Sequence, residues 1–343
     1  PLLVNGARQV GKTYILRKFG EEQFKNMVYV NLETNLTIAS YFNDNIAPEH
    51  LLRYLEASTG ERIIAGETLI FFDEIQSCER ALTSLKYFCE ETPEFHIVAA
   101  GSLLGVAINR QHYSFPVGKV ETITMYPLDF EEYLWARGKE FLASEIRSAF
   151  ETMTALPEAL HAEATELYRE YLLIGGMPAS INAFLRNGSF LDVSLVQNEI
   201  LDNYIADMAK YASNADSVKI RACYNSIPAQ LAKDNRKFQY KVVQKGGSAS
   251  LFGASIEWLY LAGVVLKCQR ISQAFEPISV YADLSAFKLY MGDAGLLTAK
   301  SGLSQQTVLS GEGNTFMGAV TENYVAQQLA ANGHNLYYWE SSN

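Results

Sequence analysis

The feature of this sequence that most constrains its fold is a glycine-rich loop near the N-terminus, Gly6-Ala7-Arg8-Gln9-Val10-Gly11-Lys12-Thr13. Its spacing is that of a phosphate-binding loop: a glycine, four residues, a second glycine, then lysine and threonine. Glycine reaches backbone angles that a side chain forbids, so several backbone N–H groups can close around phosphate oxygens. The sequence therefore predicts a nucleotide site formed by these eight residues together with Tyr14.

The residues on either side of the loop fit the same structure. Residues 2–5 are typical of a buried strand, and residues 13–19 begin a helix with an expected apolar face at Ile15, Leu16 and Phe19. A helix that starts here directs the positive end of its dipole toward the phosphates. Lys12 would bring its charge to the outer phosphates, and the hydroxyl of Thr13 would bind Mg²⁺. The alternative is a chance glycine turn before a helix, and the order of strand, loop and helix favours the nucleotide site.

A second chemical motif follows Thr68 and a run of four apolar residues, 69–72, which is typical of a strand buried on both faces. Asp73 and Glu74 come at its carboxyl end, the edge where open α/β sheets bind ligands. We expect Asp73 to hold Mg²⁺ through its water shell, and Glu74 to be the catalytic base that orients the attacking water. The alternative is an ordinary strand with an acidic turn, and the phosphate loop upstream makes it the weaker explanation.

A further strand, 95–100, ends at Gly101-Ser102. P-loop proteins with a catalytic glutamate have an extra strand between the loop strand and the aspartate strand, with a polar residue at its tip facing the γ-phosphate. Ser102 is placed to be that residue, and a serine that only caps the next helix explains the sequence equally well. With strands at 27–33 and 120–126, five strands alternate with helices, which predicts a parallel sheet with helices on both faces.

Composition limits the partners of this chain. It has 343 residues, 48% of them hydrophobic, and a net charge of −10, so it can bury a sizeable core and is not built for nonspecific attraction to nucleic acid. Four dispersed cysteines without metal-ligand spacing favour reduced thiols in the cytoplasm. No leader sequence and no apolar stretch of membrane-spanning length is present, so we expect a cytoplasmic protein with no membrane partner.

The rest of the chain divides by pattern. Residues 1–139 are expected to be the P-loop domain, and the helical pattern of 140–212, with breaks at residues 157, 175–178 and 187–188, predicts a helical connector. Its cations Arg169, Arg186, Lys210 and Lys219 could each sense the nucleotide, and the sequence does not choose among them.

Residues 213–272 suit a winged-helix-like module of three helices and a strand. Its third helix, 249–262, has none of the Arg, Lys, Asn or Gln side chains that read bases. Phosphate contacts could come from five cations just upstream: Lys233, Arg236, Lys237, Lys241 and Lys245. DNA binding by this module stays an alternative, and a packing module between domains is favoured.

The last part, 273–343, combines a strand at 287–291 with an amphipathic helix over 315–331 and a short strand near residue 337. We expect Phe316, Val320 and Tyr324 to share one face of that helix, with Val325 and Leu329 beside it.

Several motifs together resemble a known family. They are the loop at 6–13, Phe-Asp-Glu-Ile-Gln at 72–76, Gly101-Ser102, and the runs 126–133, 175–178, 288–296 and 322–325. Over nearly the whole chain, this set resembles the prokaryotic AAA-type ATP-binding proteins related to the archaeal ATPases of the signal-transducing NTPase class. Members often have a Gly-Arg pair before the fifth strand, where this chain has Gly118-Lys119. The arginine finger is therefore unassigned, and Arg110 is a second cation considered for a contact between subunits.

The resemblance also implies that a domain of unknown function follows the ATPase part and ends in the start of an endonuclease-like fold. Glu322 would be the helix carboxylate of that fold. The two acids and the lysine that a nuclease needs do not follow it before residue 343, so nuclease activity is not supported, and we expect the fold to continue further.

The sequence thus predicts an ATP-binding protein that hydrolyses ATP slowly with Mg²⁺ and uses the nucleotide as a switch, alone as a homo-oligomer or with a partner protein. One rival is a DNA-binding regulator or nuclease-like effector in which ATP is only a switch. Another is a module that holds nucleotide without turnover.

Overall fold

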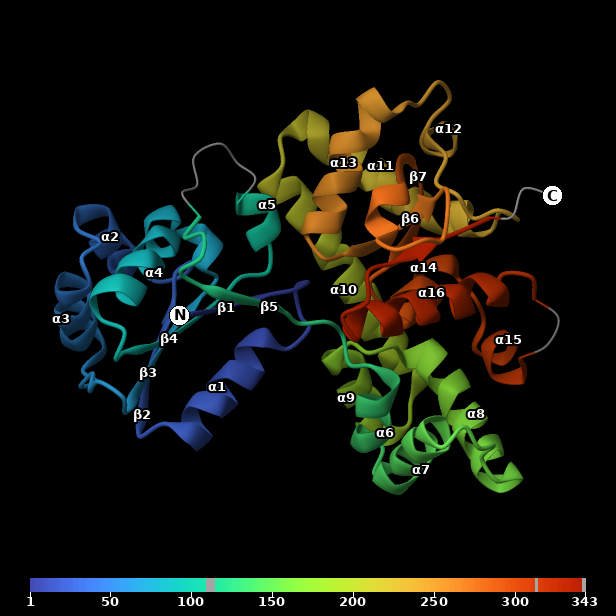
Figure 1. The fold of residues 1–343 in the computed structure, drawn as a ribbon, viewed down its shortest axis with the longest axis horizontal. Helices are drawn as coiled ribbons and strands as arrows, with labels where there is room; N and C mark the ends of the chain where they lie inside the picture. Colours follow the sequence, from blue (N-terminus) through green and yellow to red (C-terminus); the bar gives the residue numbers. More distant parts are fainter. Residues whose placement is uncertain (109–114, 312–313, 341–343) are drawn as a thin grey trace. The chain divides into compact units, whose positions relative to one another are not determined.

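The computed structural model describes residues 1–108, 115–311 and 314–340, and the chain forms two compact units, Pro1–Met125 and Tyr126–Asn343 (Figure 1). Arg110 lies outside the described residues. The finer domain boundaries at residues 139, 212 and 272 stay predictions.

The first unit contains the predicted parallel sheet of five strands, in the order β2-β3-β4-β1-β5. The strands are β1 (Leu2–Asn5), β2 (Asn26–Asn31), β3 (Thr68–Asp73), β4 (His96–Ala100) and β5 (Glu121–Thr124). As predicted, β4 lies between β1 and β3. Because these strands are parallel, the end of β1, where the loop begins, and the end of β3 at Asp73 lie at the same edge of the sheet, the one formed by the carboxyl ends of the strands. Every residue of β3 is buried, since apolar side chains point to both faces of the sheet.

Helices cover both faces of this sheet. They are α1 (Lys12–Gln23), α2 (Leu36–Asp44), α3 (Pro48–Thr59), α4 (Glu79–Glu91) and α5 (Leu104–Ile108), with the 3₁₀ turn η1 (Ile75–Ser77). The alternation of β3 decides what each face packs against: Ile70 and Phe72 contribute to the larger core with α2, α3 and α4, whereas Leu69 and Phe71 pack with Leu16 of α1.

The apolar face predicted for α1 is only partly correct. Leu16 is buried, but Ile15 and Phe19 are 45% and 47% exposed. The buried residues of the helix are Lys12, Leu16 and Gly20, because a spacing of four residues keeps them on one side. At Gly20 a Cβ would lie 2.6 Å from the sulfur of Met27, so glycine lets the helix approach the sheet closely.

The second unit begins with helices whose breaks fall where the sequence predicts them. They are α6 (Phe130–Ala136), α7 (Glu140–Glu151), α8 (Glu158–Ile174), α9 (Pro178–Asn187) and α10 (Phe190–Tyr211). Asp129 is the N-cap of α6 in a capping box with Glu132: Asp129 Oδ1 accepts from the N–H of Glu132 at 2.8 Å, and Glu132 Oε2 accepts from the N–H of Asp129 at 2.9 Å.

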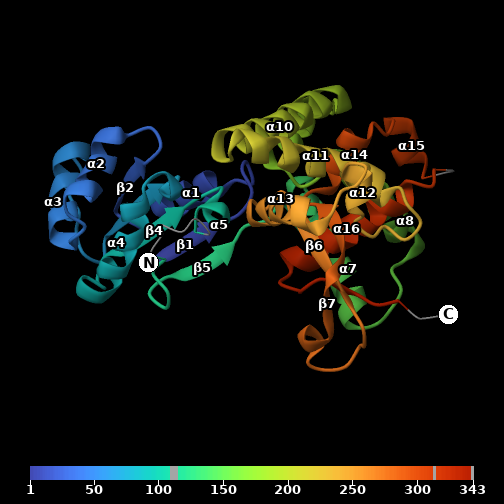
Figure 2. The same cartoon turned by 90° about the horizontal axis from the view of Figure 1, so that it is seen from above.

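Three helices and a small sheet follow. The helices are α11 (Asn214–Leu231), α12 (Tyr240–Val243) and α13 (Ala249–Leu261), and the sheet has the order β7-β6-β8 from β6 (Val265–Ile271), β7 (Ala282–Met291) and β8 (Tyr337–Tyr338). β6 and β7 are antiparallel, and the end of their hairpin, with the 3₁₀ turn η2 (Ile278–Tyr281), points away from the helices of this unit (Figure 2). The winged-helix assignment stays a prediction.

The helices α14 (Ala294–Ser301), α15 (Gln305–Ser310) and α16 (Met317–Ala331) complete the unit. On α16 the predicted Val320 is buried and Phe316 and Tyr324 are half-buried, but Val325 and Leu329, expected beside them, are 47% and 43% exposed. The polar Asn323 and Gln327 are fully buried instead. Asn323 exchanges two hydrogen bonds with the backbone of Met291, and Gln327 accepts from the N–H of Ala294. Backbone groups at the end of β7 and the start of α14 thus select polar side chains for the buried face of α16.

A buried carboxylate holds the middle of this unit together. Asp293 is 1% exposed and accepts hydrogen bonds from the N–H groups of Gly176 (2.6 Å) and Leu296 (2.8 Å). Burial raises the pKa of Asp293 to about 6, against the opposing effect of these hydrogen bonds. The turn between α8 and α9 is correspondingly tight: a Cβ at Gly176 would lie 2.0 Å from the carbonyl oxygen of Leu128. Glycine at this turn is therefore a steric requirement.

We predict that Gly176→Ala destabilises the protein by about 1–3 kcal/mol, because the backbone at Leu128 must move to admit a methyl group. The matched control is Gly253→Ala in α13, where a Cβ meets no atom within 4 Å and the better helix former should stabilise by up to about 1 kcal/mol. Thermal unfolding of both variants measures this, and equal midpoints would contradict the steric explanation.

Candidate nucleotide-binding site

The phosphate loop connects β1 to α1 through a backbone that few residues can adopt. Gly6 and Gly11 have φ values of 143° and 100°. A Cβ at Gly6 would lie 2.2 Å from the carbonyl oxygen of Met125, so only glycine lets the loop pass against the chain that leaves β5. Gln9 also has a positive φ, 68°, which costs a non-glycine residue roughly 1–2 kcal/mol. The other loop residues differ in exposure, since Val10 is buried whereas the side chain of Tyr14 is exposed.

Lys12 is held beneath this loop. Its side chain is buried, and Nζ donates to the carbonyl oxygens of Gly6 (2.9 Å) and Ala7 (2.8 Å). Burial lowers the pKa of Lys12 to about 8, while the negative charges of Glu74 and Asp73 act in the opposite direction. The ammonium therefore stays charged at neutral pH, with two of its three N–H donors bound to the loop itself.

The start of α1 suits an anion. Gly11 is the N-cap residue, and as a glycine it has no side chain that could accept a hydrogen bond from the first turn of the helix. The first N–H groups of a helix have no partner inside it, and the helix dipole places positive potential there. Together with Lys12, the loop can surround a phosphate group on several sides.

Asp73 lies beside the first turn of α1 and is almost fully buried. Its Oδ2 accepts from the hydroxyl of Thr13 (2.9 Å) and from the phenol of Tyr29 (3.0 Å), and its Oδ1 accepts from the N–H of Glu74 (3.1 Å). Burial raises the pKa of this carboxyl, and the hydrogen bonds from Thr13 and Tyr29 work against that rise. The sequence analysis missed Tyr29, which precedes the end of β2 by two residues and thus shares a sheet face with Asp73.

Glu74 and Ser102 come together at the same edge of the sheet. The hydroxyl of Ser102 donates to Glu74 Oε2 at 3.1 Å, and Gln76 Nε2 donates to the same oxygen. Glu74 has a φ of 50°, which turns its side chain away from the direction of β3. A Cβ at Gly101 would lie 2.6 Å from Gln76 Oε1, so glycine before Ser102 makes room for Gln76. Gln76 is a second site residue that the sequence analysis did not single out.

These residues fit a nucleotide with Mg²⁺. The loop at Gly6 leaves a cradle without a side chain, and one hydroxyl and one carboxylate are already in hydrogen-bond contact at Thr13 and Asp73. Among residues 1–108, 115–311 and 314–340, no group of three or more His, Cys, Asp or Glu side chains could hold a metal ion. Mg²⁺ typically binds through one or two protein groups, water and substrate phosphates, which matches this donor set.

Of the two cations considered for a role between subunits, the described one, Lys119, is not part of this cluster. Lys119 forms an ion pair with Glu90 at 3.0 Å, at the surface of the first unit. Arg110 lies outside the described residues.

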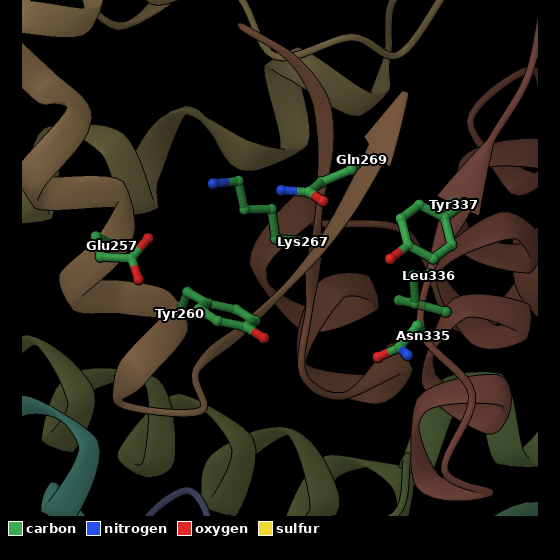
Figure 3. Close-up of a pocket in the computed structure, with 7 residues that line it drawn as sticks. All are labelled: Glu257, Tyr260, Lys267, Gln269, Asn335, Leu336 and Tyr337. Atoms are coloured by element: carbon green, nitrogen blue, oxygen red, sulfur yellow. The ribbon is translucent and has the colours of Figure 1, made fainter. Parts of the chain in front are cut away.

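The second unit contains a separate open hollow of about 260 Å³ (Figure 3). It lies between α13, β6 and the residues before β8, and Glu257, Tyr260, Lys267 and Gln269 are among its lining residues. Nothing in the sequence pattern pointed to it. Its lining contains a carboxylate as well as an ammonium, so it offers no concentrated positive charge to a phosphate backbone.

No helix in the described part of the chain combines the length and the apolar character needed to cross a membrane.

Comparisons with known proteins agree with this geometry. Residues 1–134 match the family model of an AAA domain, and residues 165–307 match the model of a domain of unknown function. A comparison with curated proteins finds no match.

Among solved structures, a Walker-type ATPase of Pyrococcus abyssi is similar at a TM-score of 0.52 and 15% identity, over 87% of this chain and 90% of that one. The ORC2 protein of Aeropyrum pernix covers 95% of this chain and 88% of its own at 11% identity, with a TM-score of 0.35. The ORC1 protein of the same organism, solved in complex with DNA, covers 91% and 86% at 13% identity, with a TM-score of 0.31. TM-scores this low support no conclusion from the last two.

Residues 1–134 thus have a P-loop NTPase-like fold and match an AAA domain model, and a region that matches a domain of unknown function follows them.

Proposed function

We propose that this chain binds ATP with Mg²⁺ at the 6–13 loop, hydrolyses it slowly, and uses the nucleotide state as a switch. The observation that carries the proposal is the convergence of Lys12, Thr13, Asp73 and Glu74 at one edge of the sheet, joined by the contacts of Thr13 with Asp73 and of Lys12 with the loop. A lone glycine turn would not bring a lysine, a hydroxyl and two carboxylates together.

Each residue has a distinct role in this proposal. The N–H groups of the loop and Lys12 would bind the phosphates and stabilise the charge that develops on them. Thr13 and Asp73 would hold Mg²⁺, which neutralises phosphate charge when bound. Glu74 would orient the attacking water and accept its proton.

Ser102 links the base to the nucleotide. Its hydroxyl has one proton, which it donates to Glu74 Oε2. A γ-phosphate would compete for the same proton, so a Ser102 that turns to the phosphate leaves Glu74 free to accept from water. This supports Ser102 as the sensor of the γ-phosphate rather than a helix cap alone.

We expect slow turnover because no arginine finger has been assigned to stabilise the transferred γ-phosphoryl group. An arginine finger contributes about 10³–10⁵-fold to turnover in related chemistry. Of the two cations considered for that role, Lys119 is paired with Glu90, so we expect the isolated chain to turn over slowly and a second copy or a partner protein to accelerate it.

The backbone itself connects the phosphate loop to the second unit. The N–H of Met125 donates to the carbonyl oxygen of Asn5 at 2.8 Å, and Gly6 packs against the carbonyl of Met125. Tyr126, the next residue, begins the second unit. The chain therefore leaves the first unit directly beside the phosphate loop, where a nucleotide-dependent shift of the loop would act on it.

The first prediction for this site concerns binding. Mg-ATP at 100 times its dissociation constant should stabilise the protein by about 2.7 kcal/mol and raise the melting temperature by several degrees. Lys12→Ala should abolish that shift, whereas Lys18→Ala, a change at an exposed position of the same helix, should keep it. A full shift in Lys12→Ala would place the nucleotide elsewhere.

The second prediction separates the two carboxylates. Asp73→Asn should weaken Mg²⁺-dependent binding, because the amide has no negative charge and only one oxygen, so it cannot accept from Thr13 and from the N–H of Glu74 on separate oxygens. Glu74→Gln should bind Mg-ATP nearly as the unchanged protein does and lose on the order of 10²-fold or more in turnover. Phosphate release and nucleotide titration measure both, with Glu67→Gln at the surface as control. Unchanged turnover in Glu74→Gln would remove it from the role of base.

The alternative of DNA binding is disfavoured by ion pairs in the second unit. Of the five cations upstream of α13, Arg236 forms an ion pair with Glu322, and Lys237 lies 2.5 Å from a carboxylate oxygen of Glu340. These cations would have to leave their partners to meet phosphates. The end of the β6–β7 hairpin exposes the apolar side chains of Phe275, Val280 and Leu284.

We therefore predict no tight binding of duplex DNA through α13 and no metal-dependent cleavage. Titration of a labelled duplex at low salt, with and without ATP, measures this. Any residual binding through Lys233, Lys241 and Lys245 should have a log–log salt slope of about −3 or shallower. Sub-micromolar, sequence-selective binding that survives Lys237→Glu with Lys241→Glu would favour the regulator instead.

A further inference from the structure

Tyr29 is an aromatic side chain that hydrogen-bonds to Asp73, the carboxylate of the proposed metal site. It lies on β2, and its hydroxyl donates to Asp73 Oδ2 at 3.0 Å, the same oxygen that accepts from Thr13. The parallel register pairs Tyr29 with Phe71 and Asn31 with Asp73. The phenol therefore reaches along its own sheet face to the end of the neighbouring strand.

The ring of Tyr29 is fixed by contacts that do not involve its hydroxyl. It packs edge-to-face against Phe71, with centroids 5.3 Å apart, and the guanidinium of Arg17 lies 5.0 Å from its centroid. A cation over the ring makes a phenol a stronger hydrogen-bond donor. These two contacts aim the hydroxyl at Asp73 and would remain if the hydroxyl were removed.

The carboxylate of Asp73 is held at three points. Thr13 and Tyr29 donate to one oxygen, and the N–H of Glu74 donates to the other. Three donors from three different elements fix the rotation of the carboxylate about its Cβ–Cγ bond. This rotation matters because the hydroxyl of Thr13 donates its only proton to Asp73. While that hydrogen bond is kept, the lone pairs of the hydroxyl oxygen are available to Mg²⁺.

We propose that Tyr29 is a positioning residue for the Mg²⁺ site, which orients Asp73 so that Thr13 and Asp73 receive the ion together with the nucleotide phosphates. The inference rests on the proposed function. It assigns to the phenol no contact with the nucleotide and no part in the chemical step. Its effect is on the affinity for the metal.

The expected size of the effect follows from other metal sites. Removing a hydrogen-bond partner of a metal-binding side chain typically costs 10–100-fold in metal affinity or activity. In Tyr29→Phe the ring contacts stay and only the third support of Asp73 is lost. We expect about a tenfold rise in the Mg²⁺ concentration for half-maximal effect, with turnover at saturating Mg²⁺ close to that of the unchanged protein.

The experiment titrates Mg²⁺ at fixed ATP against Tyr29→Phe and the unchanged protein, with fluorescence of a labelled ATP analogue and thermal shift as readouts. The same nucleotide is also titrated in EDTA, where no metal can bind. The matched control is Tyr41→Phe, which removes a phenol whose hydroxyl contacts Ser58 at 3.0 Å in the same unit, away from Asp73.

The outcomes separate the possibilities. A raised Mg²⁺ requirement in Tyr29→Phe alone, with nucleotide affinity in EDTA unchanged, supports the inference. An unaltered Mg²⁺ titration overturns it, and so does equal weakening with and without metal, which would make Tyr29 merely structural. If the unchanged protein itself binds no Mg-ATP, the proposed function fails and the inference with it.

Discussion

The hydrogen bond between Thr13 and Asp73 is the contact on which the proposed chemistry of the first unit depends. It joins the first turn of α1 to the end of β3, two elements that a parallel sheet brings to the same edge. The bond occurs in a sheet where β4 separates β1 from β3, and the loop that leads to Thr13 turns through positive φ angles at Gly6 and Gly11. Sheet order and glycine geometry thus fix the distance between a hydroxyl and a carboxylate that lie far apart in the sequence.

The sequence could predict those site residues that belong to a local motif. Lys12, Thr13, Asp73 and Glu74 were identified because each follows an apolar strand in a motif with its own spacing. The sequence could not predict Tyr29 and Gln76 as site residues. The role of Tyr29 depends on which strand lies beside β2, and the role of Gln76 depends on the tight turn after β3. Tyr29 becomes informative only when its register against β3 is known, and Gln76 only when Gly101 is seen to leave room for it.

The second unit shows the same limit in its core. Periodicity correctly located α16 and its buried Val320, but it placed the exposed Val325 and Leu329 beside that face and did not select Asn323 and Gln327, which are buried. A hydrophobic pattern cannot find a polar residue whose burial is compensated by backbone partners. Asn323 satisfies both backbone groups of Met291, and Gln327 bonds to Ala294 and to the hydroxyl of Tyr171.

These polar contacts also explain the motifs of the second unit that carried no recognisable chemistry. The glycine turn before α9, the segment before α14 and the buried face of α16 all meet around Asp293. Glycine is needed at 176 for the approach to Leu128 and at 295 because a Cβ there would lie 2.5 Å from the backbone nitrogen of Gly175. Residues that resemble a functional signature therefore serve here to bury one carboxylate with full hydrogen bonding. Since an unpaired buried carboxylate costs several kcal/mol, these hydrogen bonds favour assembly of the three segments together. Such a unit would suit the proposed nucleotide-driven switch, because buried hydrogen bonds join its segments to one another.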